Sequence, residues 1–188
     1  MTDTAASTHE NQEVAAARAG TRGVVVSLNR SHGGVPKAPV EEARVFVDGM
    51  EHDRQKNLKY HGGPDRALCL YSAERIEALR EEGHPIAAGT TGENATISGL
   101  DWSRVVPGVR LRLGADVLAE ITSFADPCRT IRGSFVGGRS GRISQKKHPG
   151  WSRVYARVLV PGVVRVGDDV ELASADRGAE RAGGASRD

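Results

Sequence analysis

Short runs of apolar residues, many alternating with polar ones, dominate the chain between residues 21 and 173. Seven runs have the length of a β-strand, and several show the period of two typical of a half-buried strand. They lie at residues 23–28, 43–47, 67–71, 109–113, 117–122, 154–160 and 169–172. The stretch VRLRLGADVLAEI predicts two strands joined by a tight turn, and PGVVRVGDDVEL predicts another reversal of the chain.

One helix is predicted within this β-rich pattern, in the stretch SAERIEALREEG. Ser72 is a favourable N-cap, Glu74 suits the first turn, and Gly83 suits the position that ends a helix. Ile76 and Leu79 mark its buried stripe. Many short strands with Gly and Pro turns indicate a mainly β fold, a twisted β-barrel with a few helical insertions.

The length of 188 residues favours one domain with a full hydrophobic core. Residues 1–20 are rich in Ala, Thr and Glu and show no strand pattern, whereas residues 174–188 are small, charged and glycine-rich. Both stretches are therefore expected to be disordered tails. The folded unit is predicted to span residues 21–173.

Composition narrows the functional classes. The net charge is +2 and aromatic residues are only 4%, which argues against a nucleic-acid-binding protein, because stacking platforms are scarce. Two cysteines give no disulfide framework, and no CxxC or HExxH spacing predicts a protein-only zinc site. The beginning of the sequence lacks the apolar run of a signal peptide, and no stretch is apolar enough to span a membrane. A cytoplasmic protein is expected.

The stretch DPCRTIRGSFVGGRSGRISQKKHPGW contains the first candidate for chemistry. Cys128 follows a predicted strand and precedes Arg129, Arg132 and further cations. Nearby cations lower the pKa of a thiol, and a thiolate is both a nucleophile and a soft metal ligand. Cys69, inside ALCLY, fits a buried and inert cysteine instead. The alternative for the basic stretch is a solvated loop.

Two further loops supply polar groups. In HGGPDR, the glycine turn and Arg66 suit an anion, Asp65 can orient Arg66, and His61 can donate a proton; the alternative is an ordinary surface turn. In GEN, Asn94 offers a donor and an acceptor beside Glu93, a pairing suited to the edge of a heterocycle or to an Asx turn. Lys37 lies between two prolines in a loop that could reach an anion.

In combination, these motifs resemble the MOSC family, named for the C-terminal domain of molybdenum cofactor sulfurase. The matching stretches occur in the family's order over residues 23–172: GGVPKAPV, HGGPDRALCLYS, GENATISGLD, PGVRLRLG, DPCRTIRGSF, RISQKKHPGWSRVYARVL and GVVRVGDDV. The likeness is greatest to small stand-alone bacterial members.

The resemblance implies a twisted β-barrel and one essential cysteine, matching Cys128. In relatives that bind molybdopterin, this cysteine ligates the molybdenum, and the proteins reduce N-hydroxylated or other N-oxygenated compounds. Lys37, Arg66, Arg129 and Arg132 would then hold the phosphate and pterin, while Asn94 and Glu93 would read the pterin edge. His61 or Asp65 would deliver a proton. Pyridoxal phosphate binding is a further association that the resemblance implies.

The sequence departs from the family pattern at GMEHDR, where His52 stands in place of an expected glycine, a change that could narrow or reshape the pocket and that leaves its effect open. Ala95 replaces a common leucine. No four-cysteine set for an iron–sulfur cluster is present, so electrons are expected from a separate flavin or iron–sulfur protein.

We therefore expect a molybdenum-cofactor oxidoreductase that acts on a small N–O substrate. The alternatives are a sulfur carrier that forms a persulfide on Cys128, an enzyme that uses Cys128 as a metal-free nucleophile, and a non-enzymatic cofactor-carrying module. An exposed strand edge would suit a homodimer.

Overall fold

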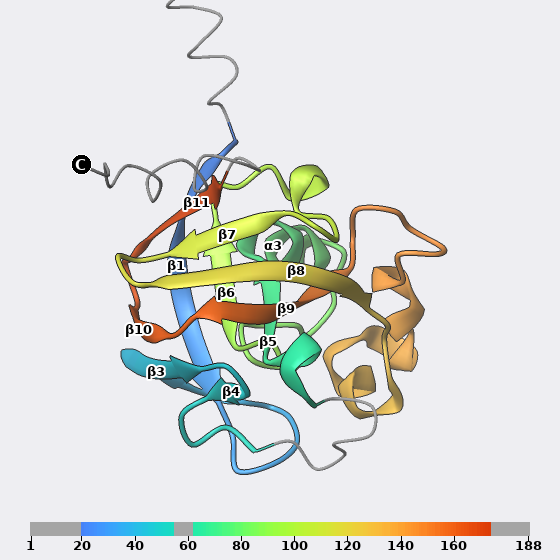
Figure 1. Cartoon of the computed structure of the whole chain (residues 1–188). Helices are drawn as coiled ribbons and strands as arrows, with labels where there is room; N and C mark the ends of the chain where they lie inside the picture. Colours follow the sequence, from blue (N-terminus) through green and yellow to red (C-terminus); the bar gives the residue numbers. More distant parts are fainter. Residues whose placement is uncertain (1–19, 55–61, 174–188) are drawn as a thin grey trace, which may run out of the picture.

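A closed barrel of seven strands forms the centre of the computed structural model, which describes residues 20–54 and 62–173 (Figure 1). The barrel strands are β1 (Arg22–Arg30), β5 (Leu68–Ser72), β6 (Ala95–Ser98), β7 (Arg110–Leu113), β8 (Val117–Ala125), β9 (Arg153–Val160) and β11 (Asp169–Ala173). Neighbours pair in the order β11-β7-β8-β9-β5-β6-β1, and β1 also pairs with β11, which closes the ring. The predicted mainly β barrel is confirmed.

Four shorter strands complete the fold. β2 (Ala38–Val40) extends the sheet beyond β1, and a separate small sheet has the order β10-β3-β4, formed by β10 (Gly162–Arg165), β3 (Glu42–Phe46) and β4 (Gly49–Met50). Each of the seven predicted runs corresponds to a strand. Residues 43–47 contribute β3 of the small sheet instead of a barrel strand, and β2, β4, β6 and β10 were absent from those runs.

The barrel core follows from the side-chain alternation. In β7, Leu111 and Leu113 point inward while the arginines between them face solvent. β5 is instead buried at every position. Leu68 and Leu70 belong to the main core, whereas Cys69 packs in a second, small cluster with Ala125 and Tyr155. This second cluster borders the candidate site.

The predicted helix is α3 (Ala73–Glu81). The Ser72 side chain accepts a hydrogen bond from the Arg75 N–H at 3.2 Å, which satisfies one of the free donors of the first turn. Ile76 and Leu79 are buried, and Gly83 has a φ of 86°, the left-handed conformation that ends a helix. Two single-turn 3₁₀ helices, η1 (Pro64–Arg66) and η2 (Trp102–Arg104), lie elsewhere in the described chain. In that part of the chain, no helix is long and apolar enough to cross a lipid bilayer.

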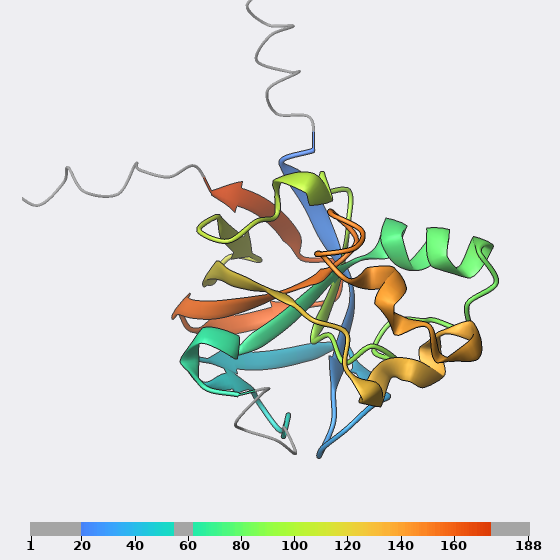
Figure 2. The same cartoon turned by 90° about the vertical axis from the view of Figure 1, so that its right-hand side faces the viewer.

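Residues 129–148, which we call the basic segment, contain three short 3₁₀ helices: η3 (Arg129–Ser134), η4 (Val136–Gly138) and η5 (Ser140–Ile143). Figure 2 shows these turns beside α3 on one side of the barrel. Strands cannot form here because the sequence has no alternation, and Gly137 and Gly138 have φ of 63° and 69°. The tails predicted at residues 1–20 and 174–188 lie outside the described residues, except for Gly20.

Candidate functional site

A cavity of about 220 Å³ opens at one end of the barrel. It brings together the loop between β1 and β2, the end of β8, the start of β9, β5 and the loop before β6. Its walls consist of Gly34, Val35, Lys37, Arg54, Cys69, Thr91, Gly92, Asn94, Cys128, Thr130, Ile131, Arg153 and Tyr155. Both cysteines of the chain and three cationic side chains therefore line one cavity.

The Cys128 thiol is half-buried in the cavity wall, at the residue that precedes η3. Partial burial alone would raise its pKa. Hydrogen bonding by the Thr130 hydroxyl and by the N–H groups of Thr130 and Ile131, together with the charge of Arg153, outweighs this effect, and the pKa of Cys128 lies below its ordinary value. The thiolate is therefore more populated near neutral pH than in an ordinary cysteine, as the sequence predicted.

Cys69 lies in the same wall and has the opposite character. Its side chain is 5% exposed, and burial raises the pKa of its thiol. Its backbone is fixed by Asn94: the Cys69 N–H donates to Asn94 Oδ1 at 3.0 Å, and the Asn94 N–H donates to the Cys69 carbonyl at 2.6 Å. These directions make Cys69 a neutral part of the wall and leave Cys128 as the candidate for a reactive sulfur.

A buried arginine forms part of the cavity wall. Arg153, at the first position of β9, is 4% exposed, and its guanidinium donates to the carbonyls of Thr91 and Asp126. Its Nε–H has no hydrogen-bond partner among the described residues. Since an unpaired buried donor is costly, this group favours an acceptor inside the cavity. Arg153 thus places positive charge and an unused donor beside the thiols.

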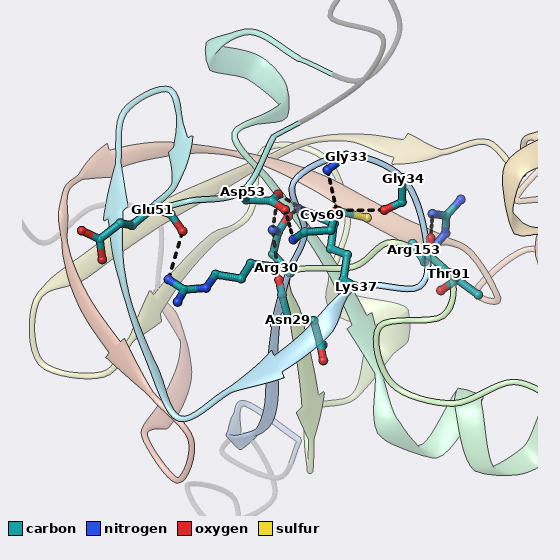
Figure 3. A network of polar contacts seen from close by, with 12 residues as sticks. Asn29, Arg30, Gly33, Gly34, Lys37, Glu51, Asp53, Cys69, Thr91 and Arg153 are labelled. Atoms are coloured by element: carbon teal, nitrogen blue, oxygen red, sulfur yellow. Dashed lines mark hydrogen bonds and ion pairs between the residues drawn. The ribbon is translucent and has the colours of Figure 1, made fainter.

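A second polar network lies at the edge of the cavity (Figure 3). Lys37 Nζ lies 2.5 Å from Asp53 Oδ2, and the two side chains are 8% and 3% exposed. The Asn94 side-chain amide donates to the same Asp53 oxygen at 2.8 Å, and the Ser31 N–H donates to Asp53 Oδ1 at 2.8 Å. Asp53 therefore ties three segments of the chain together at the cavity edge.

Lys37 and Asn94 are the two predicted cofactor-binding residues that the structure places in the same cavity as Cys128. Both have internal partners. Asn94 donates to Asp53 and, at 3.4 Å, to the Asn29 carbonyl, and accepts from Cys69, so in the described structure its amide positions the wall. Lys37 lines the cavity while its ammonium group pairs with Asp53.

Glu93 is fully buried and does not line the cavity, contrary to its predicted place at the pterin edge. Its carboxylate accepts from the Gly89 N–H at 2.6 Å and from the Thr91 hydroxyl at 2.7 Å. Thr91 lines the cavity and accepts from Arg153 through its carbonyl. Glu93 therefore orders the loop that supports Arg153.

The remaining predicted residues lie elsewhere. Arg66 and Asp65 border a separate hollow of about 460 Å³, in which Asp65 lies 3.5 Å from Arg157. The Arg66 guanidinium sits over the Tyr155 ring, 5.5 Å from its centroid, so Arg66 adjoins the back of one cavity wall. Arg129 and Arg132 are exposed on the basic segment, outside the cavity lining, because η3 turns their side chains outward. His61 lies outside the described residues.

His52, whose effect on the pocket the sequence left open, lies outside the cavity lining. Its side chain is exposed and is absent from the cavity wall. Its φ of 57° is left-handed, a conformation that glycine adopts at lower cost. The glycine expected at this position therefore serves the turn that leads into Asp53.

Several residues of the site were missed by the sequence analysis: the wall residues Arg54, Thr130, Arg153 and Tyr155, and Asp53, which holds the wall residues Lys37 and Asn94. Arg153 had a detectable signature, because a charged residue begins a strand that is otherwise buried over its first half. Asp53 had none within its own loop, since its partners lie 16 and 41 positions away in sequence.

The family model of the MOSC domain matches residues 57–171. The protein YflK of Bacillus subtilis (strain 168) is 32% identical over 143 residues, covering 75% of this chain and 63% of YflK. YiiM of Escherichia coli (strain K12) is 33% identical over 149 residues, covering 72% of this chain and 65% of YiiM. The chain thus spans less than two thirds of the length of these relatives. A Gibberella moniliformis protein named "Reductase" is 30% identical over 139 residues, covering 71% of this chain but 24% of that protein.

Solved structures show the same fold. The crystal structure of YiiM from Geobacillus stearothermophilus has a TM-score of 0.61 and 26% identity, covering 84% of this chain and 77% of that protein. YiiM from Escherichia coli gives a TM-score of 0.61 and 27% identity, with 82% and 71% coverage.

Proposed function

Because the chain belongs to the MOSC domain family, we propose that it binds molybdopterin through Cys128 and reduces small N-oxygenated compounds. The observation that carries this proposal is the donor set of the cavity. A half-buried thiol of lowered pKa shares one cavity with Lys37 and Arg153. A soft sulfur ligand beside cations suits a metal held by an anionic cofactor.

The cavity fits one end of such a cofactor. Arg153 lines the cavity and supplies buried positive charge, and its Nε–H has no hydrogen-bond partner among the described residues. The volume of about 220 Å³ is smaller than that of a typical pocket for a complete ligand, so the cofactor would extend from Cys128 toward the mouth.

Among residues 20–54 and 62–173, no group of three His, Cys, Asp or Glu side chains could hold a metal ion. A metal at Cys128 would therefore take its other ligands from the dithiolene of the cofactor. Bound there, molybdopterin would supply two-electron oxygen-transfer chemistry, and the protein would supply orientation and charge. Lys37 and Arg153 would hold its anionic groups.

The balanced reaction is R–NH–OH + 2e⁻ + 2H⁺ → R–NH₂ + H₂O, with the N–O bond broken and the electrons provided by a separate donor protein. One proton must reach the leaving oxygen. Asp65 lies in the other hollow beside Arg157. Tyr155 lines the cavity, and burial raises its pKa to about 12, so it stays protonated at neutral pH. Since the leaving hydroxide is the stronger base, with water at a pKa of about 15.7, we assign this proton to the Tyr155 hydroxyl.

The test is turnover by protein produced in a host that makes molybdopterin. An N-hydroxylated base and an amidoxime serve as substrates, with reduced methyl viologen as the electron source. The wild type should form the amine or amidine, Cys128→Ala should be inactive, and Cys69→Ala should retain most activity. Molybdenum-loaded protein that leaves every N–O compound unreduced would overturn the proposed reaction.

The lowered pKa of Cys128 also suits a sulfur carrier, because a thiolate attacks the outer sulfur of a donor persulfide, the donor leaves as its own thiolate, and the transferred sulfur stays on Cys128 as a persulfide. Incubation with a cysteine desulfurase and cysteine should then add the mass of one sulfur atom to Cys128. Such a product on metal-free protein, together with no molybdenum binding, would favour this second function.

A further inference from the structure

The basic segment carries an excess of positive charge that the cavity does not use. The sequence contains no acidic residue between Asp126 and Asp168, while residues 129–148 contain six Lys and Arg residues. One of these, Arg142, is neutralised by Glu82 through contacts of 2.6 and 2.9 Å. The side chains of the other five have no hydrogen-bond or ion-pair partner in the described chain: Arg129, Arg132, Arg139, Lys146 and Lys147.

The segment is held firmly despite its lack of strands. The Arg142 guanidinium stacks 3.6 Å from the centroid of the Trp151 ring while it pairs with Glu82 at the end of α3. The Phe135 ring packs edge-on against His84 at 5.3 Å, and the Ser134 hydroxyl donates to the Thr90 carbonyl at 2.9 Å. A basic tail in solvent would need no such anchors. The five free cations are therefore presented on a preorganised surface.

This surface is continuous with the cavity wall. Arg129 and Arg132 belong to η3, which also supplies the wall residues Thr130 and Ile131 and follows Cys128 directly. η3 packs against η4 and η5, so the backbone that carries the remaining cations lies on the same side of the barrel (Figure 2). A partner seated on this face would lie beside the sulfur that the proposed function assigns to the metal.

We propose that the exposed face of the basic segment docks an acidic redox protein, such as a ferredoxin or flavodoxin, which delivers electrons beside Cys128. The proposal rests on the proposed function for the redox nature of the partner; the acidic character follows from the five unpaired cations. Electrostatic steering by such a face speeds encounter and weakens with salt, because the Debye length is about 10 Å at 0.1 M ionic strength.

Binding of an oxidised acidic [2Fe–2S] ferredoxin to the full chain, measured by isothermal titration calorimetry, tests the docking face. We expect affinity to fall at least tenfold between 20 and 200 mM NaCl, because the Debye length shortens about threefold over this range. Arg129→Glu with Arg132→Glu should also weaken binding at least tenfold. The matched control, Arg44→Glu with Arg112→Glu, makes the same charge change on exposed positions of β3 and β7 and should leave affinity within about twofold.

The same titrations on metal-free Cys128→Ala separate this inference from the proposed function. Docking should persist in this variant. If the wild type binds ferredoxin but contains no molybdenum, the proposed cofactor is refuted and the docking face is supported. If the control pair weakens ferredoxin binding as much as the Arg129/Arg132 variant does, the proposed docking face is refuted. Tighter binding of a single-stranded 20-mer oligonucleotide than of ferredoxin, lost in the Arg129/Arg132 variant, would overturn the acidic protein as its occupant.

Discussion

Lys37 Nζ and Asp53 Oδ2 lie 2.5 Å apart at the edge of the cavity, with both side chains more than nine-tenths buried. Asp53 also accepts from Asn94, whose amide fixes the Cys69 backbone. This one carboxylate therefore couples the lysine loop, the turn after β4 and the wall formed by β5. Lys37, which the sequence predicted to hold an anion, is one partner of a buried ion pair.

Removal of the Asp53 carboxylate should destabilise the fold strongly. Asp53→Ala leaves the Lys37 ammonium buried without its partner, and breaking such a pair typically costs about 3–5 kcal/mol of unfolding free energy. Urea denaturation followed by circular dichroism measures the loss. The double variant Lys37→Met with Asp53→Leu should recover only part of it, because no buried charge is left unpaired but the Ser31 N–H and the Asn94 amide still lose their acceptor. A loss below about 1 kcal/mol in Asp53→Ala would show that the pair is not buried in solution.

The two thiols should differ in reactivity with pH. The lowered pKa of Cys128 predicts faster iodoacetamide alkylation at pH 7 than for an ordinary cysteine, whereas the raised pKa of Cys69 predicts slower alkylation at every pH. Mass spectrometry of single-cysteine variants separates the sites. Thr130→Val removes one group that favours the Cys128 thiolate and should slow labelling at pH 7 by roughly two- to tenfold. Equal rates for both cysteines would contradict the assignment of Cys128 as the reactive sulfur.

Acid should loosen the basic segment. Hydrogen bonding from Arg142 lowers the pKa of Glu82 below its ordinary 4.5, so the Glu82–Arg142 pair stabilises fully above that pH and is lost as pH falls through the lower folded value. Solvent screening at this surface limits the contribution to about 1 kcal/mol or less.

Hydrogen exchange measured by mass spectrometry between pH 5 and 3, corrected for the intrinsic exchange rate at each pH, should therefore show lower protection in residues 139–148 at the acidic end. Glu82→Gln should give that lower protection already at pH 5. Glu77→Gln, which breaks the exposed pair with Arg80 on the same helix, should not. Unchanged exchange in Glu82→Gln would mean that the Trp151 contact alone holds the segment.

His52→Gly should leave the cavity intact and stabilise the turn slightly. The left-handed φ of 57° strains a residue with a Cβ, so glycine relieves strain while increasing the freedom of the unfolded chain. The net change in unfolding free energy should be a gain of up to about 1 kcal/mol. Alkylation of Cys128 should be unchanged; a clear change in its rate would show that His52 does reach the site.

The β-rich core could be predicted because burial imposes a local pattern. Alternation at residues 109–113 and the capping signals around Ser72 each lie within one element, and both are confirmed. β6 was harder to recognise: ATIS is four residues long and pairs in parallel with β5, a contact that no local turn specifies.

The site was less predictable because its partners are distant in sequence. Cys128 and Lys37 carried recognisable motifs, but charge alone does not tell which cations face inward. Arg153 is buried under the cavity, whereas Arg129 and Arg132 are exposed on η3. That outcome depends on how the glycine-rich turns of the basic segment pack against α3.

The most direct test of the central proposal is the molybdenum-to-protein ratio of purified full chain from a molybdopterin-producing host, determined by plasma mass spectrometry. We predict near-stoichiometric molybdenum in the wild type and in Cys69→Ala, with loss of most of the metal in Cys128→Ala while circular dichroism shows an unchanged fold. Equal molybdenum in wild type and Cys128→Ala, or none in either, would contradict the assignment of Cys128 as the metal ligand.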